Sequence, residues 1–249
     1  MARHVGSKWK RTEALLGNSN LGRFVAPTEK LTEETLYVML QHYGMVFVKP
    51  VIGMHGHGVM KVERLWGQEQ PYAYQTGVIR KSFPTFAKLM TSLHGETGNK
   101  PYLVQRGIQL LKYKGRPFDL RVAAQLAPSG KWETTGMIGR VAHKGKIITN
   151  YHNGGSLMEV EKLLTPYATA SELAHCIKRL KELGELSGTE MYKHFPKLKE
   201  IGLDIGVSSD LMPWIIEVNT SPDLFVFRHL SDKSVFRKVR RYAKANGRM

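Results

Sequence analysis

Three oxygen-bearing side chains interrupt an otherwise apolar stretch near the end of this 249-residue chain. Residues 201–219 read IGLDIGVSSDLMPWIIEVN, two strand-like runs that hold Asp204, Glu217 and Asn219. Glu217 and Asn219 are two residues apart, so in a strand their side chains point to the same face. A hairpin turn centred on residues 209–211 would place Asp204 opposite Glu217, on that face.

Two carboxylates and one amide oxygen on a rigid hairpin are hard oxygen ligands. They suit Mg²⁺, which keeps several waters and completes its octahedron with substrate phosphates. The stretch therefore predicts a metal site that works together with a phosphorylated ligand. The alternative is a strand end whose acids are solvated or paired with arginine. Thr-Ser-Pro follows at 220–222, and we interpret it only as the signal that stops the strand.

A lysine-ended strand and a glycine-rich loop, FVKPVIGMHGHGV at 47–59, are a second candidate for phosphate binding. Lys49 would bring a fixed positive charge. Gly53, Gly56 and Gly58 let the backbone approach a ligand and direct N–H groups at phosphate oxygens. The spacing matches neither the Walker P-loop nor the dinucleotide fingerprint, so neither fold is indicated. On its own, the loop could equally be the turn of a glycine-rich hairpin.

Asp119 and Arg121 share one face of the alternating stretch FDLRVAAQL (118–126), and Arg140 lies in its expected partner strand, WETTGMIGRVA. Arginine binds phosphate or carboxylate groups through two hydrogen bonds at once. The same residues could instead form a cross-strand surface ion pair that contributes little to stability. Taken alone, the pattern favours the surface pair.

The charge of the chain is strongly positive, with 37 Lys and Arg against 21 Asp and Glu and a formal net charge of +16. Part of this excess lies in the final stretch, 228–249. That stretch reads as a solvated C-terminal helix, with a basic docking surface as the alternative. An excess this large favours polyanionic partners: nucleic acid, a phosphate-rich ligand, an anionic membrane or an acidic protein.

Composition indicates a globular protein, with 42% hydrophobic and 23% charged residues. No stretch reaches the roughly 20 apolar residues that cross a bilayer. The N-terminus has basic residues without an apolar segment after them, unlike a secretory signal. Cys176 is the only cysteine, which fits a reducing compartment. We therefore expect a cytoplasmic protein.

Helices and strands must position these candidate side chains. One helix is predicted behind Thr32, which can serve as its N-cap, and another behind Ser82. A long helical pattern covers 167–194, with predicted interruptions near Gly184 and Gly188. The apolar and alternating runs between the helices predict strands, several of them antiparallel neighbours. This mixed order favours an α+β fold over a doubly wound parallel sheet.

Taken in chain order, these pieces resemble the ATP-grasp superfamily. More narrowly, KYKGRPFDLRV, GKWETTGMIGRVA and WIIEVNTSPDL resemble the YheC/YheD family of endospore coat-associated proteins. The resemblance spans about residues 7–227, so it does not depend on a single motif. The motifs that carry it are the lysine-ended strand, the glycine-rich loop, QRGI at 105–108, Asp119-x-Arg121, Arg140, Asn150 with Gly154-Gly155, Asp204 and Glu217-x-Asn219.

The resemblance implies two α+β subdomains that hold ATP between antiparallel sheets, without a full N-terminal domain ahead of them. Residues 1–30 would be a basic N-terminal segment and linker. Residues 31–108 would form the first subdomain, with the glycine-rich flap. Residues 109–230 would form the second subdomain, with the metal site, and 231–249 a basic C-terminal helix or tail.

The resemblance also implies roles for residues on the nucleotide side. Lys49 would contact the α- and β-phosphates, under a flap from Gly53 through Gly56 to Gly58. A further lysine of the family matches Lys8 best, with Lys10 as the alternative. The remaining nucleotide-binding positions implied are the adenine hinge at Gln105, Arg106 and Ile108, together with Asp119.

On the reacting side, the resemblance implies that Arg121 and Arg140 bind the γ-phosphate or an acyl-phosphate. Asn150 and Gly155 would lie against the acceptor. One or two Mg²⁺ (or Mn²⁺) ions would be held by Asp204, Glu217 and Asn219.

The implied activity is ATP-dependent ligation of a carboxylate to an amine or thiol through an acyl-phosphate. Its partners would be small-molecule or peptide substrates, and a coat protein or other acidic partner could use the basic surface. By family resemblance, the location would be the spore coat. The first alternative is a coat-associated protein that binds ATP without turnover. The second is a basic nucleic-acid-binding protein, although no motif that reads nucleic acid is present.

Overall fold

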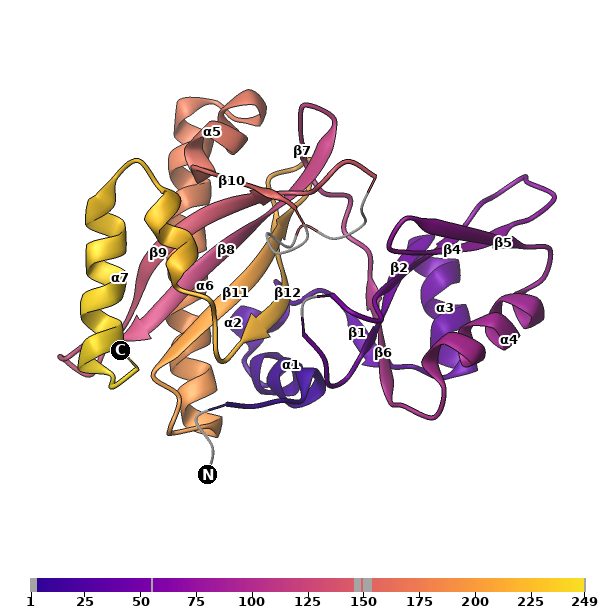
Figure 1. Ribbon diagram of the computed structural model, residues 1–249, viewed down its shortest axis with the longest axis horizontal. Helices are drawn as coiled ribbons and strands as arrows, with labels where there is room; N and C mark the ends of the chain where they lie inside the picture. Colours follow the sequence, from indigo (N-terminus) through magenta and orange to yellow (C-terminus); the bar gives the residue numbers. More distant parts are fainter. Residues whose placement is uncertain (1–3, 55, 146–148, 150–153, 249) are drawn as a thin grey trace.

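The computed structural model describes residues 4–54, 56–145, 149 and 154–248 and confirms an α+β chain. Two antiparallel sheets lie next to each other along the length of the molecule, and helices pack against both of them (Figure 1). No helix in these ranges has the length and apolar character needed to cross a membrane. The candidate site lies between the two sheets.

The first sheet has the strand order β1-β6-β2-β3-β4-β5, with every neighbouring pair antiparallel. Helices α3 (Glu33–Tyr43) and α4 (Phe86–Thr97) pack against one core with its strands, through apolar residues such as Leu36, Leu89 and Leu93. The strands are β1 (Thr28–Lys30), β2 (Met45–Pro50), β3 (Met60–Arg64), β4 (Tyr72–Thr76), β5 (Ile79–Phe83) and β6 (Tyr102–Arg106).

The start of α3 follows its prediction, and the start of α4 does not. Thr32 caps α3 and shares a reciprocal capping box with Thr35. The N-cap of α4 is Thr85, and Ser82 lies instead in β5, opposite Ala73 of β4. The prediction was wrong because β5 continues through Ser82 to Phe83, which leaves Thr85 to open the helix.

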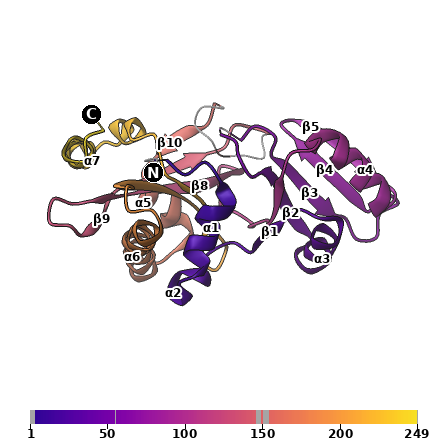
Figure 2. The same ribbon diagram turned by 90° about the horizontal axis from the view of Figure 1, so that it is seen from below.

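The second sheet has the order β10-β9-β8-β11-β12, and a short strand β7 also pairs with β8. Helices α5 (Val160–Leu164) and α6 (Ala170–His194) pack on one face, with α1 beside them. Helix α7 (Lys233–Ala245) packs on the opposite face (Figure 2). The strands are β7 (Lys112–Tyr113), β8 (Arg116–Leu126), β9 (Trp132–Val141), β10 (Ser156–Met158), β11 (Glu200–Val207) and β12 (Pro213–Asn219).

Helix α6 runs without interruption through Gly184 and Gly188, which corrects the predicted breaks. A Cβ atom at Gly184 would lie 2.2 Å from Thr134 Oγ1, and one at Gly188 would lie 2.2 Å from Trp132 Cε3. Both glycines therefore allow the helix to approach β9 closely. The packing against the sheet outweighs the low helix propensity of glycine.

The N-terminal segment, predicted as a linker, contributes to both halves of the fold. Its helices α1 (Lys8–Leu16) and α2 (Ser19–Gly22) bring Leu15 and Leu21 into the core of the second sheet. The following strand, β1, is the edge strand of the first sheet. The predicted C-terminal helix is α7, whose Val239 and Ala243 are buried against the sheet.

Candidate functional site

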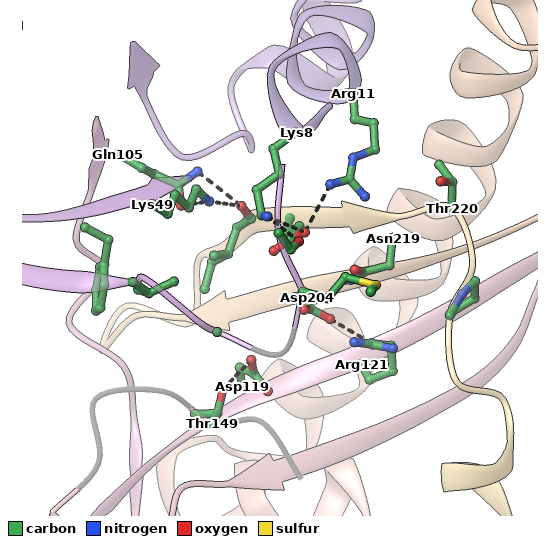
Figure 3. Close-up of a pocket in the computed structure, with 18 of the residues that line it drawn as sticks. Lys8, Arg11, Lys49, Gln105, Asp119, Arg121, Thr149, Asp204, Asn219 and Thr220 are labelled. Carbon is green, nitrogen blue, oxygen red and sulfur yellow. Dashed lines mark hydrogen bonds and ion pairs between the residues drawn. The ribbon is translucent and has the colours of Figure 1, made fainter. Parts of the chain in front are cut away.

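A cavity of about 690 Å³ lies between the two sheets (Figure 3). Both halves of the molecule and helix α1 contribute to its wall. Among the described residues, six Lys or Arg and four Asp or Glu line it, and their charges sum to about +2 with the histidines neutral. The predicted residues that line it are Lys8, Lys49, Gly53, Gly56, Gln105, Arg106, Ile108, Asp119, Arg121, Arg140, Asp204, Glu217 and Asn219.

The β11–β12 hairpin has the predicted register, with Asp204 opposite Glu217. A β-bulge between Asp204 and Ile205 places Ile215 opposite Ile205 and leaves Ile216 as the surplus residue of β12. As a result, Ile216 and Glu217 both line the cavity. Their neighbours Ile215 and Val218 are both buried in the core below.

The carbonyl oxygen of Ile216 connects the two halves of the molecule. It accepts hydrogen bonds from Lys49 Nζ and from Gln105 Nε2, each at 3.1 Å. Lys49 Nζ also donates to Gln105 Oε1 at 2.7 Å, and Gln105 Nε2 donates to Thr28 Oγ1 at 2.8 Å. The Gln105 side chain therefore positions Lys49. Any contact of Gln105 with a base would come from the backbone of Gln105.

Lys49 lies at the end of β2 and is only 6% exposed. Burial lowers the pKa of its ammonium group to about 8, because a charged amine loses its hydration there. The carboxylate of Glu217 partly opposes this effect. An anion that enters the cavity would therefore stabilise the charged form of Lys49.

Helix α1 brings Lys8 and Arg11 to the same carboxylate. Lys8 Nζ lies 4.0 Å from Glu217 Oε1 and donates to the carbonyl of Gly53 at 2.7 Å. Arg11 Nη2 donates to Glu217 Oε1 at 3.2 Å, and burial lowers the pKa values of both cations. Of the two lysines considered for this position, Lys8 is buried in the cavity wall and Lys10 is exposed.

Arg11 was not predicted from the sequence as a site residue. It lines the cavity and is only 4% exposed. Its Nε is buried without a hydrogen-bond partner in the described part of the chain. The available signal was helical spacing: Lys8, Arg11 and Leu15 recur every three or four residues and so lie on one face of α1.

A second charged cluster joins β8, β9 and β11, where cross-strand neighbours are Asp119 with Arg140 and Arg121 with Asp204. Arg140 donates twice to Asp119, through Nε at 2.8 Å and Nη2 at 2.6 Å. Arg121 Nε donates to Asp204 Oδ1 at 2.7 Å, and Thr149, another unpredicted residue, donates to Asp119 at 2.5 Å. All four charged residues line the cavity and are largely buried, so the surface ion pair favoured from sequence alone is wrong.

The ion pairs favour the charged forms of Asp204 and Arg140. Burial alone would raise the pKa of Asp204, but Arg121 and Arg140 lower it to about 2. Burial likewise acts to lower the pKa of Arg140, but Asp119 and Asp204 raise it above its usual value. Both groups therefore stay charged near neutral pH.

The donor set at the hairpin fits a hard divalent cation. The hydrogen bonds and ion pairs of Glu217 described above all go to Oε1, and Asn219 donates to Asp204 Oδ2 through Nδ2 at 3.2 Å. Glu217 Oε2 and Asn219 Oδ1 are thus available as oxygen ligands. Within the described residues, no cluster of three or more His, Cys, Asp or Glu is present. Such a sparse set suits Mg²⁺ that arrives with phosphates better than a cation held by protein alone.

The predicted adenine hinge lies at the apolar end of the cavity, where Phe47 and Leu110 also line the wall. The amides of Arg106 and Gly107 already donate to the carbonyls of Pro27 and Met45. The Arg106 guanidinium lies over the Trp214 ring, 4.5 Å from its centroid. A base bound here would therefore be held by other backbone groups and by apolar contacts.

Three predicted positions do not reach the cavity wall or cannot be placed. Gly58 does not line the cavity; its φ is +72°, and a Cβ there would lie 2.8 Å from the Tyr102 hydroxyl, so this glycine serves the loop itself. Gly155 also does not line it. Asn150 lies outside the described residues.

Thr-Ser-Pro at 220–222 was interpreted only as the end of a strand, yet Thr220, Ser221 and Pro222 all line the cavity, as does Asp223. This segment packs directly on β11, because a Cβ at Gly202 would lie 2.7 Å from Pro222. The strand-ending proline therefore forms part of the wall beside Asn219.

Known proteins resemble this chain in sequence and in fold. A family model described as "YheC/D like ATP-grasp" matches residues 2–245. Endospore coat-associated protein YheD of Bacillus subtilis (strain 168) is 25% identical over 231 residues, covering 90% of this chain and 49% of that protein. YheC of the same organism is 21% identical over 234 residues, covering 89% and 61%. The chain thus spans about half to three fifths of these relatives.

Solved structures show the same fold at low identity. D-cycloserine synthetase DcsG superposes with a TM-score of 0.58 at 11% identity, covering 97% of this chain and 70% of that one. N5-carboxyaminoimidazole synthase from Aspergillus clavatus, solved with ADP, gives 0.56 at 10% identity, covering 96% and 51%. The predicted ATP-grasp architecture is therefore confirmed.

Proposed function

Because the chain belongs to the YheC/D-like ATP-grasp family, we propose that it binds ATP in the cavity and ligates a carboxylate to an amine or thiol. The observation that carries this proposal is the convergence of Lys8, Lys49 and Glu217 on a cavity of net positive charge between two antiparallel sheets. A triphosphate complements such a cavity, and buried cations bind phosphate without losing further hydration.

The residues divide between binding and reaction. Lys8 and Lys49 neutralise the phosphates, while the loop with Gly53 and Gly56 covers them. Arg121 and Arg140, held by Asp204 and Asp119, bind the transferred phosphoryl group. Mg²⁺ bound with the nucleotide at Asp204, Glu217 and Asn219 would supply further neutralisation of phosphate charge.

The reaction then has two transfers. A carboxylate oxygen of the substrate attacks the γ-phosphorus, the bond to the β-phosphate oxygen breaks, and ADP leaves. The amine or thiol attacks the acyl carbon, loses its proton to solvent and displaces phosphate. The chain contributes positioning and charge stabilisation, which are the main sources of catalysis in phosphoryl transfer.

The test is ADP formation with pools of carboxylates and amines, by the wild type, by Glu217→Ala and by the exposed control Glu13→Ala. We expect activity in the wild type and the control and at least a hundredfold loss in Glu217→Ala. Equal ADP formation by all three proteins would reject the assignment. A melting temperature that rises with ATP, without ADP formation, would favour the ATP-binding role without turnover.

Partners and location follow from the same family membership. The named relatives are endospore coat-associated proteins, and we propose a coat or other acidic partner for the basic surface of this chain. The exposed residues Arg237, Arg240, Arg241 and Lys244 of α7 supply positive charge to that surface.

A further inference from the structure

A second cavity, of about 180 Å³, shares three lining residues with the nucleotide cavity: His4, Thr220 and Ser221. Thr220 directly follows Asn219 of the proposed metal site and lies beside it in Figure 3. The second cavity therefore adjoins the reacting end of the site, away from the apolar hinge. Its other lining residues are Lys197, Lys199, Glu200, Asn246 and Arg248.

The charges around this second cavity are unbalanced. Glu200, the one acid among the described residues that line it, is 8% exposed and is already engaged by an ion pair with Arg248 and a hydrogen bond from Gln125 at 3.4 Å. Lys197 and Lys199 are exposed, and no hydrogen bond or ion pair to another described residue involves their ammonium groups. Two positive charges are thus left for a ligand.

The wall between the cavities is held in place by the C-terminal residues. Arg248 Nη2 donates to the carbonyl of Pro222 at 2.6 Å. Asn246 Nδ2 donates to the carbonyls of Leu126 at 3.1 Å and Lys199 at 3.2 Å. An anion in the second cavity would therefore lie at a fixed position relative to the reacting end.

We propose that the second cavity binds a further anionic group, carboxylate or phosphate, of the substrate whose carboxylate is activated. This inference rests on the proposed function and adds a substrate class: acids that carry at least one anionic group besides the reacting one. A substrate of this kind would pass along Thr220 and Ser221, with its second anion between Lys197 and Lys199.

The test uses fluorescein-labelled peptides and fluorescence anisotropy, with Mg-ADP saturating the nucleotide cavity. The probes are a tetra-aspartate peptide, its neutral tetra-asparagine isostere and a neutral peptide with one phosphoserine. The variant is Lys197→Glu/Lys199→Glu, and the control Lys88→Glu/Lys100→Glu makes the same charge change at exposed lysines of the first half. All proteins are compared at about 0.15 M salt, where distant charges are screened.

We expect the aspartate peptide to bind the wild type and the control alike, and the variant about tenfold more weakly, as two exposed charge pairs allow. The asparagine peptide should not bind. A loss restricted to the phosphoserine peptide would identify the anion as phosphate. Equal binding by all proteins, or no binding to the wild type, would overturn the proposal. If no acid supports ADP formation but the variant still loses peptide binding, the ligase assignment fails and the anion site stands.

Discussion

The lowered pKa of Lys49 predicts that nucleotide affinity falls as the pH rises through 8. In the free protein, burial holds this pKa at about 8, well below the usual 10.5 of lysine. A bound triphosphate favours the charged form, so binding raises the pKa and takes up a proton wherever Lys49 was neutral. The affinity is therefore nearly full at pH 7 and declines as the pH rises through 8.

The size of the effect follows from the two pKa values. At pH 7 roughly nine in ten free molecules carry the Lys49 charge, and at pH 9 roughly one in ten do. If bound nucleotide returns the pKa to about 10.4, the Kd rises about tenfold between pH 7 and pH 9. Nucleotide phosphates are already ionised in this range, since their second pKa is about 6.

Isothermal titration with Mg-ADP at pH 7, 8 and 9 measures this dependence. Lys49→Arg is the matched control, because its guanidinium stays charged and should give a flat profile. The control keeps Lys8, whose pKa is also lowered by burial, so it separates the two lysines. A constant Kd in the wild type, or the same rise in Lys49→Arg, would refute the reasoning.

Three further predictions concern stability and reactivity. Asp204 has its pKa lowered to about 2, so the stability that it contributes is complete above pH 4 and is lost as the pH falls towards 2. In Asp204→Asn, the free energy of unfolding measured with urea should decline over this interval by about 2 kcal/mol less than in the wild type. An equal decline in both proteins would contradict the ion-pair account. Gly188→Ala should lower the Tm by about 5 °C through contact with Trp132, and an unaltered Tm would mean that the helix can shift away. Burial raises the pKa of Cys176, so its thiol should react with Ellman's reagent only after unfolding; rapid reaction of the native protein would disprove its burial.

The hairpin proposed to bind the metal could be predicted from sequence because its geometry is local. A strand has a period of two, and a short turn fixes the partner, so Asp204, Glu217 and Asn219 follow from spacing alone. The same period placed Asp119 and Arg121 on one face. Local patterns cannot show whether that face is covered, which is why a surface ion pair was favoured where the structure has a buried cluster.

The missed and mistaken elements depend on contacts between distant segments. Arg11 lies 206 positions before Glu217, and only the docking of α1 brings them together. Gly184 and Gly188 resemble helix breaks until β9 is placed against them. The prediction of where α4 begins failed for a different reason. Ser82 and Thr85 are both acceptable N-caps, and the pairing of Ser82 in β5 decided between them.

The surplus residue in β12 separates two tasks that this strand performs. Ile215 and Val218 face the core, and Glu217 and Asn219 face the cavity; without Ile216, the four would simply alternate. The face proposed to bind the metal therefore belongs to an ordinary strand, and the bulge adds an extra backbone carbonyl that accepts hydrogen bonds from Lys49 and Gln105. Shortening the strand by this single residue would leave every side chain on its present side while it removes the carbonyl that Lys49 and Gln105 share. The proposed ligand binding and the contact between the halves thus depend on different residues of the same strand: the side chains of Glu217 and Asn219 for the first, the carbonyl of Ile216 for the second.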